Sequence, residues 1–286
     1  MLAACGDGGG DSADRFDADR AFEDLRTQVE IGSRPSGSAG GREEVRFIVD
    51  RLREAGVRDV RVQRPYANVV GAIPGTEDDS IVLGAHHDTK TGISPEFVGA
   101  NDGASGVAVV LELARALPDR VEGPSVHLAL FDAEEARGDR PFEQDGTRGS
   151  RQYVRYAREA NRRGDPVQGS PPVEEIDSML LVDMVGDCDL QIPREANSDR
   201  KGYRYIAIGA EQVDGDPAPF VGTTTPILDD HIPFLEAGVP AVDLIDFTYG
   251  GPSNPYWHTT DDTLDHVCPE SLDAVGEALL QILPTL

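Results

Sequence analysis

The chain has 286 residues, of which 39% are hydrophobic and 27% charged, and this composition suits one large globular domain. Its 52 acidic residues outnumber its 26 basic ones and give a formal net charge of −26. This charge argues against nucleic acid and an anionic membrane surface as partners, because a polyanion would be repelled. No stretch approaches the apolar length that spans a bilayer.

The first residues carry a short motif of their own. Leu2 to Cys5 (LAAC) looks like the lipobox of bacterial lipoproteins, and Gly- and Asp-rich residues follow it. We therefore predict a flexible tether over residues 1–14 and a single domain over residues 15–286. The charged and apolar regions of a signal peptide do not precede the motif, so either the start is truncated or the match is a coincidence. We expect an exported, monomeric protein anchored by a lipid on Cys5 at the outer face of a bacterial cell membrane.

Two further cysteines, Cys188 and Cys268, stand late in the chain. They could pair in an oxidising compartment or remain as buried thiols, and the sequence leaves both possibilities open.

Helices are predicted where apolar residues recur at a spacing of three or four. They are expected over residues 16–31, 45–55, 107–117, 149–157 and from residue 269 onwards, with a shorter one over residues 231–238. Gly56 is typical of a helix C-terminal cap, and Pro118 closes the third helix.

Strands are predicted at short apolar runs rich in β-branched residues. These runs are residues 57–63, 68–73, 80–84, 125–131, 178–185, 203–209 and 239–245. A Pro-Gly turn between the second and third runs predicts that these two strands pair antiparallel. Strands alternate with helices, and most strands are apolar on both faces. The pattern predicts an α/β three-layer sandwich whose mixed, mostly parallel central sheet carries helices on both faces.

Polar residues accumulate where the predicted strands end. They are His86, Asp88, Asp102, Glu134, Glu135, Asp183, Asp229, Asp230, His231 and His258. Ligands bind in the crevice at the carboxyl ends of strands in α/β sheets, and imidazole with carboxylate suits zinc. Taken singly, each of these residues also fits a solvated acid or a packed histidine. Asp183 is the exception, because an unpaired carboxylate in a buried strand needs a partner or a metal.

The ordered motifs GAHxD, NDxxSG, FxxEE, an apolar strand that contains an Asp, and WHTxxDT resemble the zinc exopeptidase family from about Gly32 to the C-terminus. That family includes two-zinc aminopeptidases and zinc-dependent glutaminyl cyclases. The resemblance places five residues at metal-ligand positions: His86, Asp102, Glu135, Asp183 and His258. It places Glu134 at the general acid/base. It also implies a cis peptide bond between Asp102 and Gly103.

Three features resemble the cyclase branch. The segment Leu228 to Pro240 is similar to the cyclase segment whose Asp, here Asp229, joins the hydrogen-bond network of Asp183. Trp257 stands where cyclases carry a pocket-lining tryptophan, and the loop Ala136 to Arg148 is close to the cyclase length. The aromatic that animal cyclases carry in that loop has no clear counterpart, since Phe142 is the only aromatic there.

The resemblance implies a zinc enzyme that converts N-terminal glutamine of peptides to pyroglutamate and releases ammonia. One zinc would be held by Asp102, Glu135 and His258, with Glu134, Asp183 and Asp229 as catalytic residues and Trp257 against the substrate. The alternative is an aminopeptidase that holds a second zinc with His86 and Asp183. A binding module that has lost its metal is disfavoured, because all five ligand positions are filled.

Overall fold

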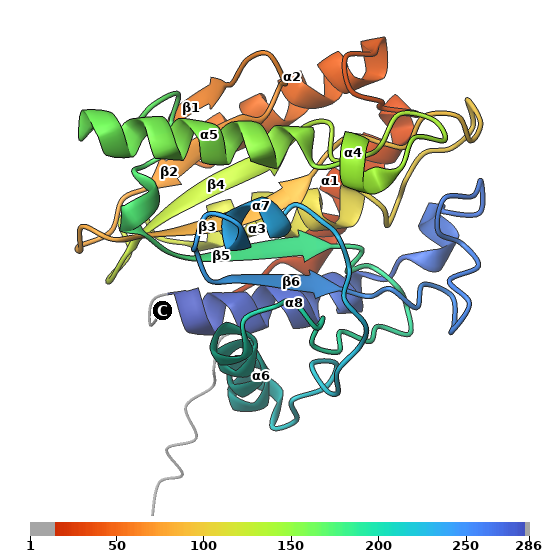
Figure 1. Ribbon diagram of the computed structural model, residues 1–286. Coiled ribbons are helices and arrows are strands. Elements are labelled where there is room, and N and C mark those ends of the chain that lie inside the picture. Colours follow the sequence, from red (N-terminus) through yellow and green to blue (C-terminus); the bar gives the residue numbers. More distant parts are fainter. Residues whose placement is uncertain (1–14, 284–286) are drawn as a thin grey trace, which may run out of the picture.

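A six-stranded sheet lies between two layers of helices in the computed structural model, which describes residues 15–283 (Figure 1). The strand order is β1-β2-β4-β3-β5-β6. The strands are β1 (Arg58–Val62), β2 (Val69–Ile73), β3 (Ser80–His86), β4 (Ser125–Phe131), β5 (Ile176–Asp183) and β6 (Ala241–Ile245). The expected tether and Cys5, the expected site of the lipid, lie outside the described residues. No helix within residues 15–283 has the length and apolar character to cross a membrane.

The strands β4, β3, β5 and β6 run parallel, and β1 and β2 add an antiparallel edge. The predicted α/β architecture is therefore confirmed. The predicted pairing of β2 with β3 is wrong, because β4 lies between them and pairs antiparallel with β2 and parallel with β3. The Pro-Gly turn after β2 connects two strands that are not neighbours.

The helices form one layer on each face of the sheet (Figure 1). One layer holds α1 (Ala18–Ile31), α2 (Ala39–Glu54), α3 (Ala104–Ala116), α6 (Arg200–Asp214) and α8 (Pro269–Ile282). The other holds α5 (Arg148–Arg163) and α7 (Ile232–Leu235), while α4 (Phe142–Asp145) lies near the carboxyl edge. Each helix layer packs on the sheet through its own hydrophobic core, and alternate residues of β4 contribute to the two cores. Leu128 and Leu130 pack under the first layer, and Ala129 and Phe131 under the second. Successive side chains of a strand point to opposite faces of the sheet, and helices cover both faces. The strands are therefore apolar throughout.

The predicted strand at residues 203–209 is wrong, because these residues lie inside α6. Asp199 caps the helix by accepting a hydrogen bond from the Gly202 backbone NH at 2.7 Å, and Gly215 ends it in the left-handed conformation. Tyr203 and Ile206 are buried at a spacing of three. The apolar run is thus one face of an amphipathic helix rather than a strand, an ambiguity that short runs carry.

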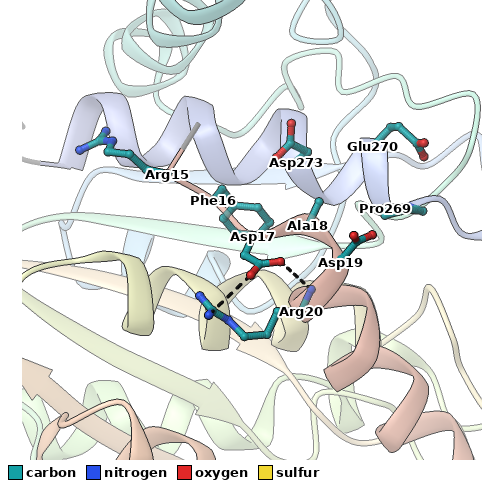
Figure 2. Close-up of a pocket in the computed structure, with 9 residues that line it drawn as sticks. All are labelled: Arg15, Phe16, Asp17, Ala18, Asp19, Arg20, Pro269, Glu270 and Asp273. Atoms are coloured by element: carbon teal, nitrogen blue, oxygen red, sulfur yellow. Dashed lines mark hydrogen bonds and ion pairs between the residues drawn. The ribbon is translucent and has the colours of Figure 1, made fainter. Parts of the chain in front are cut away.

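The start of the described chain is held against α8 (Figure 2). The ring of Phe16 is buried and occupies the space where a side chain on Gly276 would stand, at 2.2 Å from an ideal Cβ. The backbone NH groups of Arg15 and Phe16 both donate to Glu277 Oε1 at 2.5 Å. Asp17 then caps α1 by accepting from the Arg20 backbone NH. The polar hollow around these residues shares no residue with the site described below.

A disulfide joins Cys188 and Cys268, two residues whose pairing the sequence leaves open. It ties the loop after β5 to the residue that precedes α8, and the Cys268 backbone NH also donates to the Gly186 carbonyl at 2.9 Å.

Candidate active site and metal centre

The carboxyl edge of the sheet brings the five predicted ligands together. His86 is the last residue of β3 and Asp183 the last of β5. Glu135 follows the end of β4, Asp102 lies just before α3, and His258 comes from the loop after β6. Parallel strands end at the same edge, so residues that are far apart in the sequence meet there.

Asp102 stands between the two histidines. His86 Nε2 lies 3.2 Å from Asp102 Oδ1 and 3.1 Å from Asp183 Oδ1. His258 Nε2 lies 3.2 Å from Asp102 Oδ2 and 2.8 Å from Glu135 Oε1. The five residues form two groups of potential ligands that share Asp102, and within each group the ligand atoms lie within 4.8 Å of one another. We call His86, Asp102 and Asp183 the inner group, and Asp102, Glu135 and His258 the outer group.

The residues present fit a metal ion. Asp102 Oδ2 is buried and has no hydrogen-bond partner among the described residues, although it faces His258. A buried carboxylate oxygen without a partner is costly, and a cation would satisfy it. Imidazole nitrogen and carboxylate oxygen together form a donor set that zinc accepts.

Residues around the ligands hold them in place. The Asp88 carboxylate accepts hydrogen bonds from the backbone NH groups of Glu134 and Glu135, at 2.9 and 3.3 Å. Asp262 accepts from the backbone NH groups of Asn101 and Asp102 at 2.7 and 3.1 Å. Sequence reasoning gave Asp262 no role, although the motif that contains His258 also contains it. Such supporting contacts orient ligands and are part of a metal site.

The backbone of the site departs from one prediction. Within residues 15–283, cis peptide bonds occur only before Pro65 and Pro219, so the expected cis bond between Asp102 and Gly103 is wrong. Gly103 makes the turn instead, with a φ of 101° that favours glycine. An ideal Cβ there would lie 3.1 Å from the Asp88 carbonyl oxygen and 3.2 Å from the His86 ring.

Three of the seven non-glycine residues that adopt the left-handed region within residues 15–283 lie at the site. Ala133, Met184 and His258 have φ values of 60°, 47° and 55°, and the first two adjoin Glu134 and Asp183. Strained backbone of this kind persists where surrounding contacts enforce it, and it gathers at functional sites.

The remaining predicted catalytic residues line one cavity of about 360 Å³ together with both groups. Glu134, Asp183 and Asp229 are all buried, with no more than 6% of each residue exposed. Two other strand-end residues face elsewhere. Asp230 accepts a hydrogen bond from the Ser150 hydroxyl, and His231 Nε2 lies 3.3 Å from Glu195 Oε2.

The electrostatics of the cavity favour a proton carrier. Burial raises the pKa of Glu134 well above its usual value, and the neighbouring Glu135 carboxylate adds to the shift. Burial lowers the pKa of His258, but its contacts with Asp102 and Glu135 prevail and raise it to about 9. Burial alone would raise the pKa of Asp102, yet the close imidazole groups of His258 and His86 bring it below its usual value.

Aromatic side chains form the wall of the cavity. The Trp257 ring stacks on the His258 ring with centroids 4.0 Å apart, and Phe247 meets Trp257 edge to face at 4.9 Å. Phe142, at the start of α4, also lines the cavity, so the loop of residues 136–148 does supply an aromatic. Lys90 lies 3.2 Å from Glu135 Oε2, and no pattern in the sequence indicated it.

Comparison with known proteins places the chain in a family. The family model described as peptidase family M28 matches residues 68–283, and the chain belongs to this family. The resemblance to the zinc exopeptidases is thereby confirmed. The crystal structure of the Acidobacteriales bacterium glutaminyl cyclase is similar with a TM-score of 0.79 and 31% sequence identity, over 98% of this chain and 97% of that one.

Two curated relatives represent the two branches. The glutaminyl-peptide cyclotransferase of Drosophila melanogaster is 27% identical over 72% of this chain and 62% of that protein. Aminopeptidase YwaD of Bacillus subtilis (strain 168) is also 27% identical, over 70% of this chain and 39% of that protein. The chain thus spans about three fifths of the first relative and two fifths of the second.

Proposed function

We propose that the protein is a zinc-dependent glutaminyl-peptide cyclotransferase, which converts the N-terminal glutamine of peptides to pyroglutamate and releases ammonia. The observation that carries this proposal is the placement of Glu134 beside the outer group in a cavity walled by Trp257 and Phe247. The similarity to cyclases of both bacterial and animal origin supports it.

The outer group, Asp102, Glu135 and His258, would hold the zinc ion. When bound, zinc supplies a Lewis acid for the γ-amide carbonyl of the substrate. The two oxygens of Glu135 have different neighbours: Oε2 lies 3.2 Å from Lys90 Nζ, and Oε1 lies 2.8 Å from His258 Nε2.

Glu134 is the proton carrier in this proposal. The α-amine of the substrate attacks the γ-amide carbon, a C–N bond closes the ring, and the C–N bond to the amide nitrogen breaks. Glu134 takes a proton from the attacking amine and delivers it to the nitrogen that leaves as ammonia. Burial raises its pKa from the usual carboxyl value, which is the direction that a general acid/base working near neutral pH requires.

The rest of the cavity orients the substrate. Asp183 and Asp229 lie beside Glu134 and would hold its carboxyl group in position. The backbone NH of Asp230 donates to Asp229 Oδ1 at 2.5 Å and keeps that side chain turned inward. Trp257, 36% exposed, presents an apolar face at the cavity where the methylene groups of glutamine can pack.

A two-zinc aminopeptidase is the second candidate. The observation that favours it is the inner group, because His86, Asp102 and Asp183 form a second set of ligand atoms within 4.8 Å of one another. A second metal beside the first is what an enzyme needs to bind and activate water between two ions. The same Glu134 would then take the proton of that water.

Two substrates and a metal analysis distinguish the candidates. We expect the purified protein to bind one zinc per chain and to release ammonia from a peptide that begins with glutamine. We expect no amine release from a leucine anilide. Two zinc ions per chain together with rapid cleavage of the anilide would establish the aminopeptidase instead. A matched peptide beginning with asparagine, whose side chain is one methylene shorter, is the negative control for cyclisation.

Export of the protein, as a monomer with a lipid on Cys5, also remains a proposal. The disulfide between Cys188 and Cys268 supports it, because disulfides persist in oxidising compartments. Mass spectrometry of the N-terminal peptide would detect a diacylglyceryl group, and a Cys5→Ala variant should leave the membrane fraction. Light scattering after gel filtration tests the monomer.

A further inference from the structure

A groove lined with arginines lies between α2 and the segment that follows β1. Arg42, Arg46 and Arg53 come from α2 at spacings of four and seven residues, which place them along one face of the helix. Arg64 comes from the opposite wall. The groove encloses about 530 Å³ and shares no lining residue with the catalytic cavity.

The arginines in this groove lack acidic partners. Within residues 15–283, no carboxylate lies within ion-pair distance of any of the four guanidinium groups, and the Arg42 guanidinium donates to the Gly37 carbonyl at 2.7 Å. Two carboxylates line the groove, Asp50 and Asp132, and Asp132 Oδ2 already accepts from the Ala67 backbone NH at 2.8 Å. Four positive side chains thus face two negative ones in a chain whose net charge is −26.

This local excess of positive charge indicates an anionic ligand. Like charges held together repel, and an anion between them removes that cost. Arginine presents a planar fork of donors that matches the oxygens of a phosphate, and no lysine lines the groove. Arginines on both walls can approach such an anion from two sides.

The floor of the groove is apolar. Val45, Val49 and Val62 line it, and Tyr66 adds a half-buried ring. A cavity of this volume accommodates a small organic molecule rather than a bare ion. From these features we infer that the groove binds a small organic phosphate, with the phosphate among the arginines and an apolar or aromatic body on the valines and Tyr66.

Calorimetric titration with 1-naphthyl phosphate tests this inference on the full chain. We expect saturable binding that weakens as salt is added, since exposed charges are screened. Arg46→Gln and Arg64→Gln, one from each wall, should each weaken binding about tenfold, because a hydrogen bond to a charged group is lost. Arg120→Gln is the matched control: Arg120 is exposed, lies after α3 and does not line the groove.

Two further probes separate the parts of the ligand. Inorganic phosphate and 1-naphthol should each bind at least about tenfold more weakly than 1-naphthyl phosphate, because each lacks one half of the contacts. Equal binding of 1-naphthol, or no loss of affinity in Arg46→Gln and Arg64→Gln, would overturn the inference. So would an equal loss in Arg120→Gln. Binding is measured without substrate, so the result does not depend on the proposed activity.

Discussion

The two ligand groups share Asp102 but differ in what surrounds them. In the inner group, His86 Nδ1 lies 3.1 Å from the Asp88 carbonyl, and its Nε2 lies between two carboxylates. A neutral ring that donates from Nδ1 presents a lone pair at Nε2, so a proton or a metal ion must lie between Nε2 and those oxygens. In the outer group, the His258 side chain is 20% exposed and borders the cavity.

This difference bears on the number of metal ions. The inner group is the more buried of the two, with side chains only 2 to 9% exposed, so a proton held on His86 can satisfy it without an ion. The outer group is open on the side of Trp257 and Lys90, as a catalytic metal requires an open coordination position. Chemistry is therefore expected at the outer group, with the inner group supporting it.

The largest effect is expected from removing one histidine of each group. His258→Gln should abolish zinc binding and lower turnover at least about a thousandfold, because the Lewis acid is worth several kcal/mol. His86→Gln should keep zinc and lower turnover by only about 10- to 100-fold, as supporting contacts do. Zinc content by mass spectrometry and initial rates of ammonia release measure both. Equal losses of zinc and activity in the two variants would contradict the asymmetry of the groups.

Glu134→Gln tests the proposed proton carrier, which lines the same cavity as both groups. The change preserves shape and leaves Glu135 in place, so zinc should remain at its wild-type content. Turnover should fall about a hundredfold to ten-thousandfold, the usual worth of general acid/base catalysis. Loss of zinc in this variant would mean that the roles of Glu134 and Glu135 are reversed.

Trp257→Ala tests the open side of the outer group. The ring stacks on His258 and lines the cavity, so its loss should raise KM for a glutamine peptide up to about tenfold. The effect on kcat should be smaller. Tyr205→Ala, which removes an exposed ring from α6, is the control and should change neither constant. A Trp257→Ala enzyme with unchanged KM would remove this residue from substrate binding.

The smallest effect concerns a titratable group away from both ligand groups. It changes the stability of the fold with pH, so it must be known before pH effects are assigned to the site. Burial lowers the pKa of His127, on β4, to about 4. The unfolded chain binds this proton more readily, with an ordinary pKa of about 6.5, so the stability contributed by His127 is present above that pH and is lost as the pH falls toward 4.

His127→Gln removes this titration. Its melting temperature should therefore fall less than that of the wild type between pH 6.5 and pH 4, as followed by circular dichroism. Parallel pH profiles for the two proteins would show that His127 is not kept neutral in the fold.

Most of the architecture could be predicted from local patterns. Ser125–Phe131 and, within the predicted run 239–245, Ala241–Ile245 are strands because β-branched and apolar residues fit a sheet covered on both faces. The run at residues 203–209 was wrongly predicted to be a strand, because a short apolar run fits both the strand period of two and the helix period of 3.6. Its helical state depends on capping by Asp199 and on packing against α8, where the side chain of Ile282 occupies the space beside Gly209.

Sequence alone determined the chemical character of the site: which polar residues lie near the strand ends, that imidazoles and carboxylates gather there, and that the family is that of the zinc exopeptidases. These are properties of residue order and local period. Only the tertiary structure decided that β4 separates β2 from β3, that Cys188 meets Cys268, and that Asp262 and Lys90 hold the ligands. Such contacts join residues tens of positions or more apart, and their geometry follows from how the layers pack rather than from any pattern along the chain.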